Sequence, residues 1–349
     1  MTGRKNNLLK IAIVGCGSIS GQYFGAALTT KGVRIVGATD LHRETALNRV
    51  KEFGLAEHII FDTMDEMLTQ AGPDIIFDCT VPAAHCQVTI KALNAGCHVL
   101  GEKPMADCMQ SARKMVRAAG KAHRTYAVTQ NYRYNPHTRA VAKLIKNKMI
   151  GNLDMLNADY FMAPHFGGFR EHIPNPLLVE MAIHTYDMAR LISGEDPISV
   201  YCHEYNPKDS WYKGGNAAAI SIFEMTNGVV FTYRGHWCAE GRSTGWNGQW
   251  RAVGDRGTAF YDGCNPPCGE MVIKQGSPAV ATRLKPFQMK EARKQTAGHA
   301  ALIQDFIDCI RQGRQPETNC RDNIKSIAML HASIRSAQTG KRVKINLGM

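Results

Sequence analysis

The stretch KIAIVGCGSIS, residues 10–20, decides the fold of the first half of the chain. Its apolar run, residues 10–15, is typical of a buried strand, and Gly15 and Gly17 separate this run from a helix expected to start near Ser18. Two glycines here permit a tight turn and a close approach of the backbone to a pyrophosphate, while the helix N-terminus supplies N–H donors. The stretch therefore predicts a nucleotide-binding turn in a doubly wound α/β fold.

Asp40 strengthens this prediction, because the third glycine of the usual fingerprint is replaced here by Ser20. Asp40 closes the second expected strand, residues 33–40, and follows Gly17 by 23 residues. This is close to the spacing of the acid that hydrogen-bonds a ribose diol in dinucleotide-binding proteins. A carboxylate at this place repels a 2′-phosphate, so NAD is favoured over NADP, although nearby Arg43 could soften the preference.

The pattern of elements changes near residue 130. Before it, strand-like apolar runs alternate with helical segments such as 44–53, 86–95 and 107–122, which predicts a parallel sheet. The runs are residues 10–15, 33–40, 58–62, 74–80, 98–104 and 125–130. After it, a helix at 136–148 precedes longer strand-like segments joined by turn signals, which predicts a large, mostly antiparallel open sheet. We therefore expect a doubly wound domain over residues 1–130 and an α/β domain over residues 131–349.

Composition limits the classes of function. The hydrophobic fraction of 44% is ordinary for a globular protein, and no apolar run is long enough to span a bilayer. Lys10 interrupts the apolar part of the N-terminal segment, where a signal peptide would be continuous, so a cytoplasmic protein without a membrane partner is expected. Eleven cysteines are scattered, with Cys264 and Cys268 as the one close pair, so reduced thiols and no metal site are expected.

The net charge of +12 is concentrated toward the C-terminus, where residues 281–349 hold 13 Lys/Arg against 5 Asp/Glu. Such a segment could bind nucleic acid. However, it has the pattern of two amphipathic helices, at 298–312 and 321–338, and it lacks the exposed aromatic residues of single-strand binders. A solvated basic surface without a nucleic-acid partner is the expectation.

The segment NPLLVEMAIHTYDMARLISG, residues 175–194, is predicted to be a helix capped by Asn175 and ended by Gly194. Glu180, His184 and Asp187 lie at i, i+4 and i+7, so they share one stripe on an otherwise apolar helix. The stripe could be an active-site wall or a satisfied polar seam in a core.

A second segment with candidate catalytic residues is GEKPMA, residues 101–106, which ends the fifth expected strand. Ligands of open parallel sheets bind beyond the carboxyl ends of strands, so Glu102 and Lys103 are expected near a bound nicotinamide. A lysine there can stabilise a developing alkoxide.

These motifs together resemble the Gfo/Idh/MocA family of sugar and cyclitol dehydrogenases. The resemblance includes the glycine turn, TVPAAH at 80–85, EKP at 102–104, QNYRYNP at 130–136 and the helix at 175–194, in this order along most of the chain. It implies a Rossmann domain followed by an α/β domain whose open sheet forms homodimer or homotetramer contacts.

The resemblance also implies roles for individual residues. Lys103 matches the family's lysine of EKP, His184 its catalytic histidine and Glu180 its aspartate, so these three are the catalytic candidates. The cofactor-binding candidates are Gly15, Gly17, Ser18, Ile19, Asp40, Arg43, Thr80, Pro82, His85 and Glu102. Asn131 and Tyr132 match positions that touch substrate or nicotinamide, and His165 could contact substrate from the loop APHFGGFREH. Glu180 and Ala182 depart from the aspartate and glycine of the family, which indicates a different substrate pocket.

The expected reaction is hydride transfer between NAD and a secondary hydroxyl of a sugar, sugar derivative or cyclitol. His184 would act as general base, since histidine titrates near neutrality, and Lys103 would stabilise the alkoxide. Asp187 is expected to be structural, pairing along the helix or with Arg190. The alternatives are a glycosidase that uses transient oxidation by bound NAD, and a non-catalytic sugar- or NAD-sensing regulator.

All four tryptophans lie between residues 211 and 250, at positions 211, 237, 246 and 250. They could line a sugar site, because pyranose C–H faces stack on indoles, or they could serve sheet packing or a subunit interface. The sequence favours the packing role.

Overall fold

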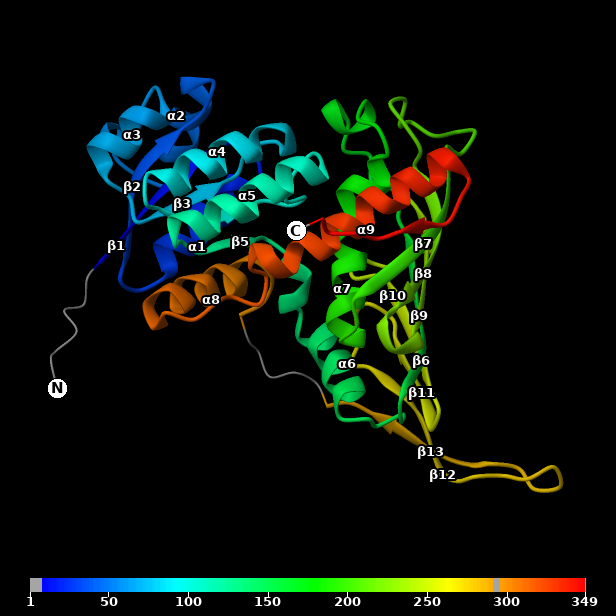
Figure 1. Ribbon diagram of the computed structural model, residues 1–349. Coiled ribbons are helices and arrows are strands. Elements are labelled where there is room, and N and C mark those ends of the chain that lie inside the picture. Colours follow the sequence, from blue (N-terminus) through cyan, green and yellow to red (C-terminus); the bar gives the residue numbers. More distant parts are fainter. Residues whose placement is uncertain (1–7, 291–295, 349) are drawn as a thin grey trace, which may run out of the picture. The chain divides into compact units, whose positions relative to one another are not determined.

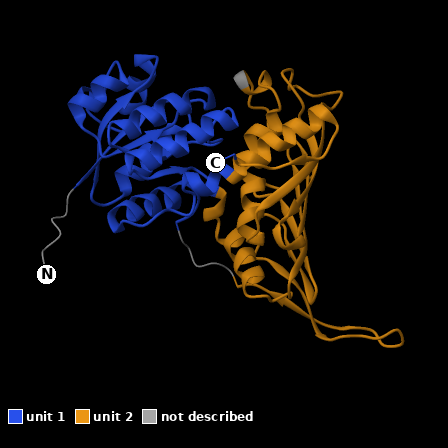
Figure 2. Ribbon diagram, in the orientation of Figure 1, with its two compact units in different colours: residues 1–131, 296–324, 348–349 blue, residues 132–295, 325–347 orange. Residues whose placement is uncertain are grey.

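The computed structural model describes residues 8–290 and 296–348. The chain forms two compact units, which Figure 2 colours separately. Unit 1 comprises residues 1–131, 296–324 and 348–349, and unit 2 comprises residues 132–295 and 325–347. The predicted boundary at residue 130 lies beside the first of these divisions. The return of residues 296–324 to unit 1 has no counterpart in the sequence-based prediction.

Unit 1 is built on a parallel sheet with the strand order β2-β1-β3-β4-β5 (Figure 1). Its strands are β1 (Leu9–Val14), β2 (Val33–Thr39), β3 (Ile75–Asp78), β4 (His98–Gly101) and β5 (Tyr126–Val128). Ile11, Ala12 and Ile13 of β1 are fully buried, as expected for a parallel sheet covered on both faces. The strand order changes direction between β1 and β3, and open parallel sheets bind ligands beyond the carboxyl ends of their strands at such a point.

The helices of unit 1 follow the strands in the predicted alternation. They are α1 (Ser20–Thr29), α2 (Arg43–Glu52), α3 (Met64–Ala71), α4 (Pro82–Asn94), α5 (Met109–Ala122) and α8 (Gly298–Gln312), with the short η1 (Glu57–Ile59). The prediction of a strand at 58–62 was wrong, because this segment contains η1 and is joined to β2 by an isolated bridge between Ala38 and Ile60. Ile59 and Ile60 are buried, so the apolar run reflects core packing instead of ladder pairing.

Unit 2 contains a nine-stranded sheet with the order β13-β12-β11-β10-β6-β9-β8-β7-β14. Its strands are β6 (Leu153–Phe161), β7 (Pro197–Tyr205), β8 (Ala218–Met225), β9 (Val230–His236), β10 (Gln249–Gly254), β11 (Gly257–Tyr261), β12 (Cys268–Lys274), β13 (Arg283–Gln288) and β14 (Val343–Lys344). The β6–β9 pair is parallel and the other pairs are antiparallel, so the prediction of a mostly antiparallel sheet is confirmed.

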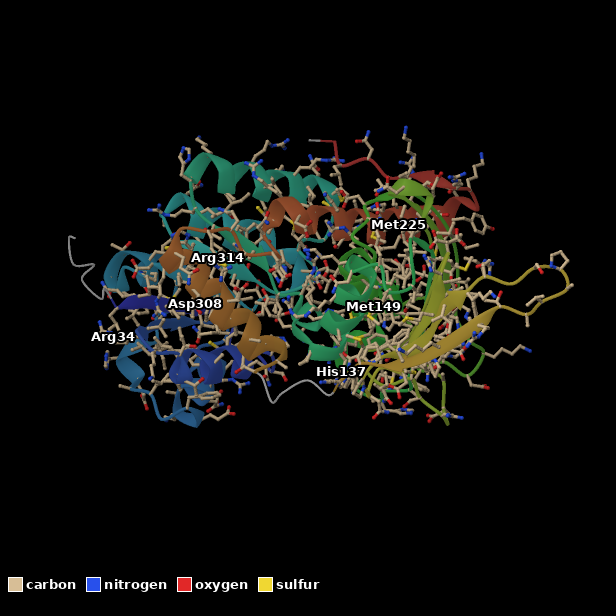
Figure 3. All side chains as sticks on the ribbon, turned by 90° about the horizontal axis from the view of Figure 1, so that it is seen from below. Arg34, His137, Met149, Met225, Asp308 and Arg314 are labelled. Atoms are coloured by element: carbon tan, nitrogen blue, oxygen red, sulfur yellow. The ribbon has the colours of Figure 1, made fainter. Side chains whose placement is uncertain are left out.

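Helices cover one face of this sheet. They are α6 (Pro136–Lys146), α7 (Ile183–Ser193) and the part of α9 (Cys320–Thr339) that belongs to unit 2. The Tyr186 hydroxyl of α7 lies 2.8 Å from Ser221 Oγ of β8, and Ser336 Oγ of α9 accepts the Cys202 N–H of β7 at 2.9 Å. Met225 at the end of β8, labelled in Figure 3, is fully buried. The core of unit 2 therefore lies between this face and the helices.

Three loops leave the sheet of unit 2 at one edge (Figure 1). β6 and β9 are parallel neighbours, so the loops that follow them, residues 162–175 and 237–248, begin at the same edge. The β7–β8 connection, residues 206–217, joins them there, because β8 is antiparallel to both β7 and β9. In the described part of the chain, no helix is long and apolar enough to cross a membrane.

Candidate functional site

The glycine turn of unit 1 has the geometry that a dinucleotide requires. Gly15 has φ of +85°, and a Cβ there would lie 2.8 Å from the backbone that follows β3. Gly17 faces open space, since no atom lies within 4 Å of the position that its Cβ would take. Ser18 and Ile19 carry the chain into α1, which starts at Ser20 and has no side-chain cap at its N-terminus. The backbone is therefore open to a phosphate at this turn.

Asp40 is held directly beside the glycine turn. Its Oδ2 accepts the Cys16 N–H at 2.8 Å and its Oδ1 accepts the His42 N–H at 2.9 Å. Arg49 of α2 donates to the Gly17 carbonyl oxygen at 3.0 Å and so fixes the turn from the other side. No sequence signal marks this role of Arg49, because a basic residue on a surface helix is common.

The loop after β3 is tied down by hydrogen bonds. Thr80 Oγ1 donates to Asp78 Oδ1 at 2.6 Å, and Pro82 is the first residue of α4. The buried His85 ring bridges two carbonyl oxygens, with Nδ1 3.0 Å from that of Pro104 and Nε2 3.0 Å from that of Thr80. His85 thus links the loops after β3 and β4.

These residues fit an NAD molecule. The open turn and the uncapped helix suit the pyrophosphate, and the Asp40 carboxylate lies at the end of β2, where a ribose diol would be recognised. Arg43 forms an ion pair with Asp62 at the surface, so its charge is already partly neutralised. A bound NAD would supply a hydride acceptor at its nicotinamide.

Glu102, at the carboxyl end of β4, is buried among polar groups of unit 1. Its Oε1 accepts the Tyr23 hydroxyl at 2.7 Å and lies 3.7 Å from His299 Nε2, and its Oε2 accepts the Lys103 N–H at 3.1 Å. Burial acts to raise the pKa of Glu102, but the hydrogen bond and charge of His299, with the Tyr23 hydroxyl and the Lys103 charge, hold that pKa below its usual value. Glu102 is therefore a carboxylate that fixes the backbone of Lys103. The sequence did not reveal the contribution of His299, which comes from α8.

The helical segment after residue 175 differs from the prediction at its start. The prediction that Asn175 caps a regular helix was wrong, because Asn175 has φ of +53° and its side chain donates to Glu204 Oε2 at 2.7 Å. A π-helical turn, Leu178–Ala182, comes first and α7 continues from it. The predicted end at Gly194 is confirmed by its left-handed conformation, with φ of +74°.

The π-turn changes the polar stripe, since Glu180 lies within it and no longer keeps the α-helical spacing to His184. His184, in the first turn of α7, is buried, and its ring packs on Tyr132 with centroids 4.4 Å apart. Glu180 Oε2 accepts Arg170 Nε at 3.3 Å. Unit 2 therefore holds a buried imidazole, an aromatic ring and a carboxylate–guanidinium pair on or against one helical segment. Asn131, the other candidate of its motif, is the last residue of the first stretch of unit 1.

Asp187 has a structural environment, as predicted, but its main partner differs. Arg133 donates from Nε to Oδ2 at 2.5 Å and from Nη2 to Oδ1 at 2.8 Å, in a bidentate buried pair. Ser326 Oγ adds a hydrogen bond at 2.7 Å, while the predicted partner Arg190 lies at 3.9 Å. Arg133 belongs to the QNYRYNP motif, and neither its burial nor its partner could be inferred from the motif alone.

His165, Trp211, Trp237 and Trp246 lie in the three loops of unit 2, and Trp250 lies in β10. The His165 ring stacks on Trp211 with centroids 3.9 Å apart, and its Nε2 lies 2.8 Å from Glu240 Oε1. Trp237 and Trp250 are each 1% exposed. These two therefore serve the packing role that the sequence favours.

The carboxyl group of Glu204 is predicted to make stability depend on pH. Burial raises the pKa of Glu204 to about 7, although hydrogen bonds from Asn175 and Asn216 act to lower it. Between the ordinary value of 4.5 and pH 7 the folded state binds a proton that the unfolded state has released, so the free energy of unfolding falls as pH rises through this window. Glu204→Gln should remove this slope, so that relative to the parent it gains about 3 kcal/mol of stability between pH 4.5 and pH 8.

Urea denaturation at several pH values measures this effect. Glu270→Gln, which removes an exposed carboxylate from β12, is the matched control and should retain the parent's slope. A Glu204→Gln variant whose stability follows the parent's pH dependence would contradict the prediction.

All eleven cysteines are free. Among residues 8–290 and 296–348, no group of three or more His, Cys, Asp or Glu side chains is arranged to hold a metal ion.

Comparison with known proteins identifies the family. Residues 9–130 match the model of the Gfo/Idh/MocA oxidoreductase family with its NAD-binding Rossmann fold, and residues 142–345 match the family's C-terminal alpha/beta domain. The chain is 23% identical to D-apiose dehydrogenase of Paraburkholderia graminis, over 96% of this chain and 89% of the relative. It is also 23% identical to inositol 2-dehydrogenase of Rhizobium meliloti, over 97% and 99% of the two chains.

A solved structure has the same fold. The oxidoreductase from Agrobacterium radiobacter, crystallised with NAD+, L-tartaric acid and magnesium, superposes with a TM-score of 0.85 at 19% identity, covering 97% of this chain and 99% of that one. With two family models spanning most of the sequence, the chain belongs to the Gfo/Idh/MocA family and is an NAD-dependent oxidoreductase related to sugar and inositol dehydrogenases.

Proposed function

We propose that the protein oxidises a secondary hydroxyl group of a sugar, sugar derivative or cyclitol, with NAD as the hydride acceptor. The observation that carries this proposal is the placement of Lys103 at the sheet edge that holds the glycine turn. Lys103 directly follows the buried carboxylate of Glu102, at the end of β4, and the turn at Gly15 follows β1 in the same parallel sheet. A lysine after the carboxyl end of β4 supports a role for its cation beside a nicotinamide and its substrate.

Each catalytic candidate has a distinct task in this proposal. The Lys103 ammonium group donates a hydrogen bond to the substrate hydroxyl oxygen and stabilises its negative charge as the proton leaves. The neutral His184 imidazole accepts that proton. Glu180, fixed by Arg170, orients the substrate through its other hydroxyl groups, and Asn131 and Tyr132 complete the contacts. Glu102 and His85 are assigned as positioning residues, because their side chains are bound within unit 1.

The cofactor preference is proposed to be NAD over NADP. Asp40 supports this, because both its carboxylate oxygens are fixed by backbone N–H groups and the charge cannot easily turn away from a 2′-phosphate. Arg43, the one nearby cation that the sequence offered to such a phosphate, is paired with Asp62.

The direct test is a screen of sugars, uronates, glycosides and inositols with NAD and, separately, with NADP, followed by absorbance at 340 nm. We expect NAD reduction with at least one carbohydrate or cyclitol, and a slower reaction with NADP. Glycoside cleavage without net NADH would instead favour the NAD-dependent glycosidase. Binding of sugar and NAD with no turnover would favour the regulator.

The open face of the nine-stranded sheet is proposed to join two copies of the chain, in a homodimer or within a homotetramer. Tyr201 pairs in register with Ile222 across β7 and β8, Ile220 lies two residues away on the same face, and all three side chains are exposed. A contiguous apolar patch on a sheet face is typical of an interaction surface. Light scattering should give a mass of two or four chains, and Ile222→Asp should lower it; a monomeric parent would contradict the proposal.

A further inference from the structure

The three loops at the sheet edge of unit 2 are bound to one another into one support. The Pro164 carbonyl oxygen accepts both Trp211 Nε1 and the Tyr212 hydroxyl, each at 3.2 Å. The backbone carbonyl oxygen of Glu171 accepts the N–H groups of Lys213 and Gly214, at 2.7 and 2.8 Å. The Tyr212 ring also stacks on Trp237 with centroids 5.1 Å apart. Because each loop is held by its neighbours, side chains on this support are preorganised.

Two aromatic rings on this support remain open to solvent. Phe166 is 55% exposed and Trp246 is 43% exposed. Their rings are nearly parallel, with an interplanar angle of 24° and centroids 6.1 Å apart, which is an offset arrangement. Phe166 also meets the edge of the buried Trp237 ring at 6.4 Å. The pair therefore forms an exposed aromatic platform of two offset rings, and its apolar area stays in water unless a ligand covers it.

Arg170 connects this platform to the proposed catalytic segment. Its guanidinium lies over the Phe166 ring, 5.5 Å from the centroid, and its Nε donates to Glu180 at 3.3 Å. The guanidinium of Arg170 therefore lies between the Phe166 ring of the platform and the Glu180 carboxylate, and it contacts both. A sugar ring held by Glu180 would leave a second ring, attached through a glycosidic bond, within reach of Phe166 and Trp246.

We propose that Phe166 and Trp246 form a stacking subsite for a second ring, so that the substrate is a glycoside or disaccharide instead of a free monosaccharide. The apolar C–H face of a pyranose, or an aromatic aglycone, would pack on the two rings, while Arg170 offers donors to its hydroxyl groups. This inference rests on the proposed function, since it takes Glu180 as a residue that orients the sugar to be oxidised.

The test compares the methyl and phenyl glycosides of the sugar that the screen oxidises fastest. We expect the parent to have a higher kcat/KM for the phenyl glycoside, and Trp246→Ala and Phe166→Ala each to lower the phenyl-to-methyl ratio of kcat/KM by about fivefold to tenfold. Trp246→Phe should recover much of this ratio, because it keeps an aromatic face. Ile273→Ala on β12, where the side chain is 49% exposed, is the control and should leave the ratio unchanged.

A second readout is direct binding, followed by the fluorescence of the exposed indole. The phenyl glycoside should change the fluorescence of the parent and not that of Trp246→Phe. The subsite is overturned if both alanine variants lower the kcat/KM values for the two glycosides equally, or if only free monosaccharides and cyclitols are oxidised. Either result would overturn the subsite but leave the proposed function supported, because a carbohydrate or cyclitol is still oxidised. If no compound of the screen is oxidised, the proposed function itself is wrong.

Discussion

His184→Asn should lower kcat by about two to four orders of magnitude, because the general base for the hydroxyl proton is removed. Asn keeps a polar side chain of similar size beside Tyr132, so α7 should still form. Lys103→Met should cause a loss of the same order, since the alkoxide would lose its cation while the aliphatic stem is retained. Steady-state kinetics with the best carbohydrate of the screen measures both effects.

Matched controls separate chemistry from structure. His58→Asn and Lys114→Met make the same changes at exposed positions of unit 1 and should leave kcat within about twofold. The affinity for NAD, measured by calorimetry, should change little in His184→Asn. If both catalytic variants keep the parent's kcat, the proposed mechanism is wrong.

The fold could be predicted from the sequence where local pattern and burial agree. The apolar run before Gly15 and the helix pattern after it predicted β1, the turn and α1, because a parallel sheet buries its strands on both faces. The helices at 298–312 and 321–338 were predicted within one residue of α8 and α9. The strand at 58–62 failed because burial alone produces the same apolar run as a buried strand.

The site was predictable as a list of residue types but not as a set of contacts. Glu102 and His299 are about 200 residues apart in the sequence. No local pattern shows that His299 comes close to Glu102 once α8 packs within unit 1. The π-turn around Glu180 could not be predicted either, because the spacing of Glu180, His184 and Asp187 in the sequence fits a regular α-helix. Long-range partners and local irregularities were therefore the parts that the structure had to supply.

The tryptophans show what the sequence could predict and what it could not. All four lie within residues 211–250, and the sequence favoured the packing role for them as a group, but it could not assign a role to each one because an indole can serve either a core or a sugar site. The structure separates them by exposure, with Trp237 and Trp250 buried and Trp246 open beside Phe166.

Asp187→Ala should destabilise unit 2 by about 3–5 kcal/mol. Asp187 is 1% exposed, and its carboxylate neutralises the bidentate guanidinium of Arg133, whose side chain is 6% exposed. Removing the carboxylate takes a bidentate ion pair away from a buried guanidinium, and Ser326 loses an acceptor. Urea denaturation followed by tryptophan fluorescence, whose probes all lie in unit 2, measures the loss.

Two further variants distinguish a buried charge effect from a simple loss of contacts. Asp196→Ala removes a carboxylate that is 45% exposed and also bound to an arginine, and it should cost less than about 1 kcal/mol. The double variant Asp187→Leu with Arg133→Met replaces both charges by apolar groups, so it should recover more than half of the stability that Asp187→Ala loses. If the double variant is as unstable as Asp187→Ala, shape and not charge dominates at this position. His184 lies one turn before Asp187 on α7, so the ion pair could also affect catalysis through the position of this helix. In that case Asp187→Ala should lower kcat, and the double variant should recover kcat together with stability.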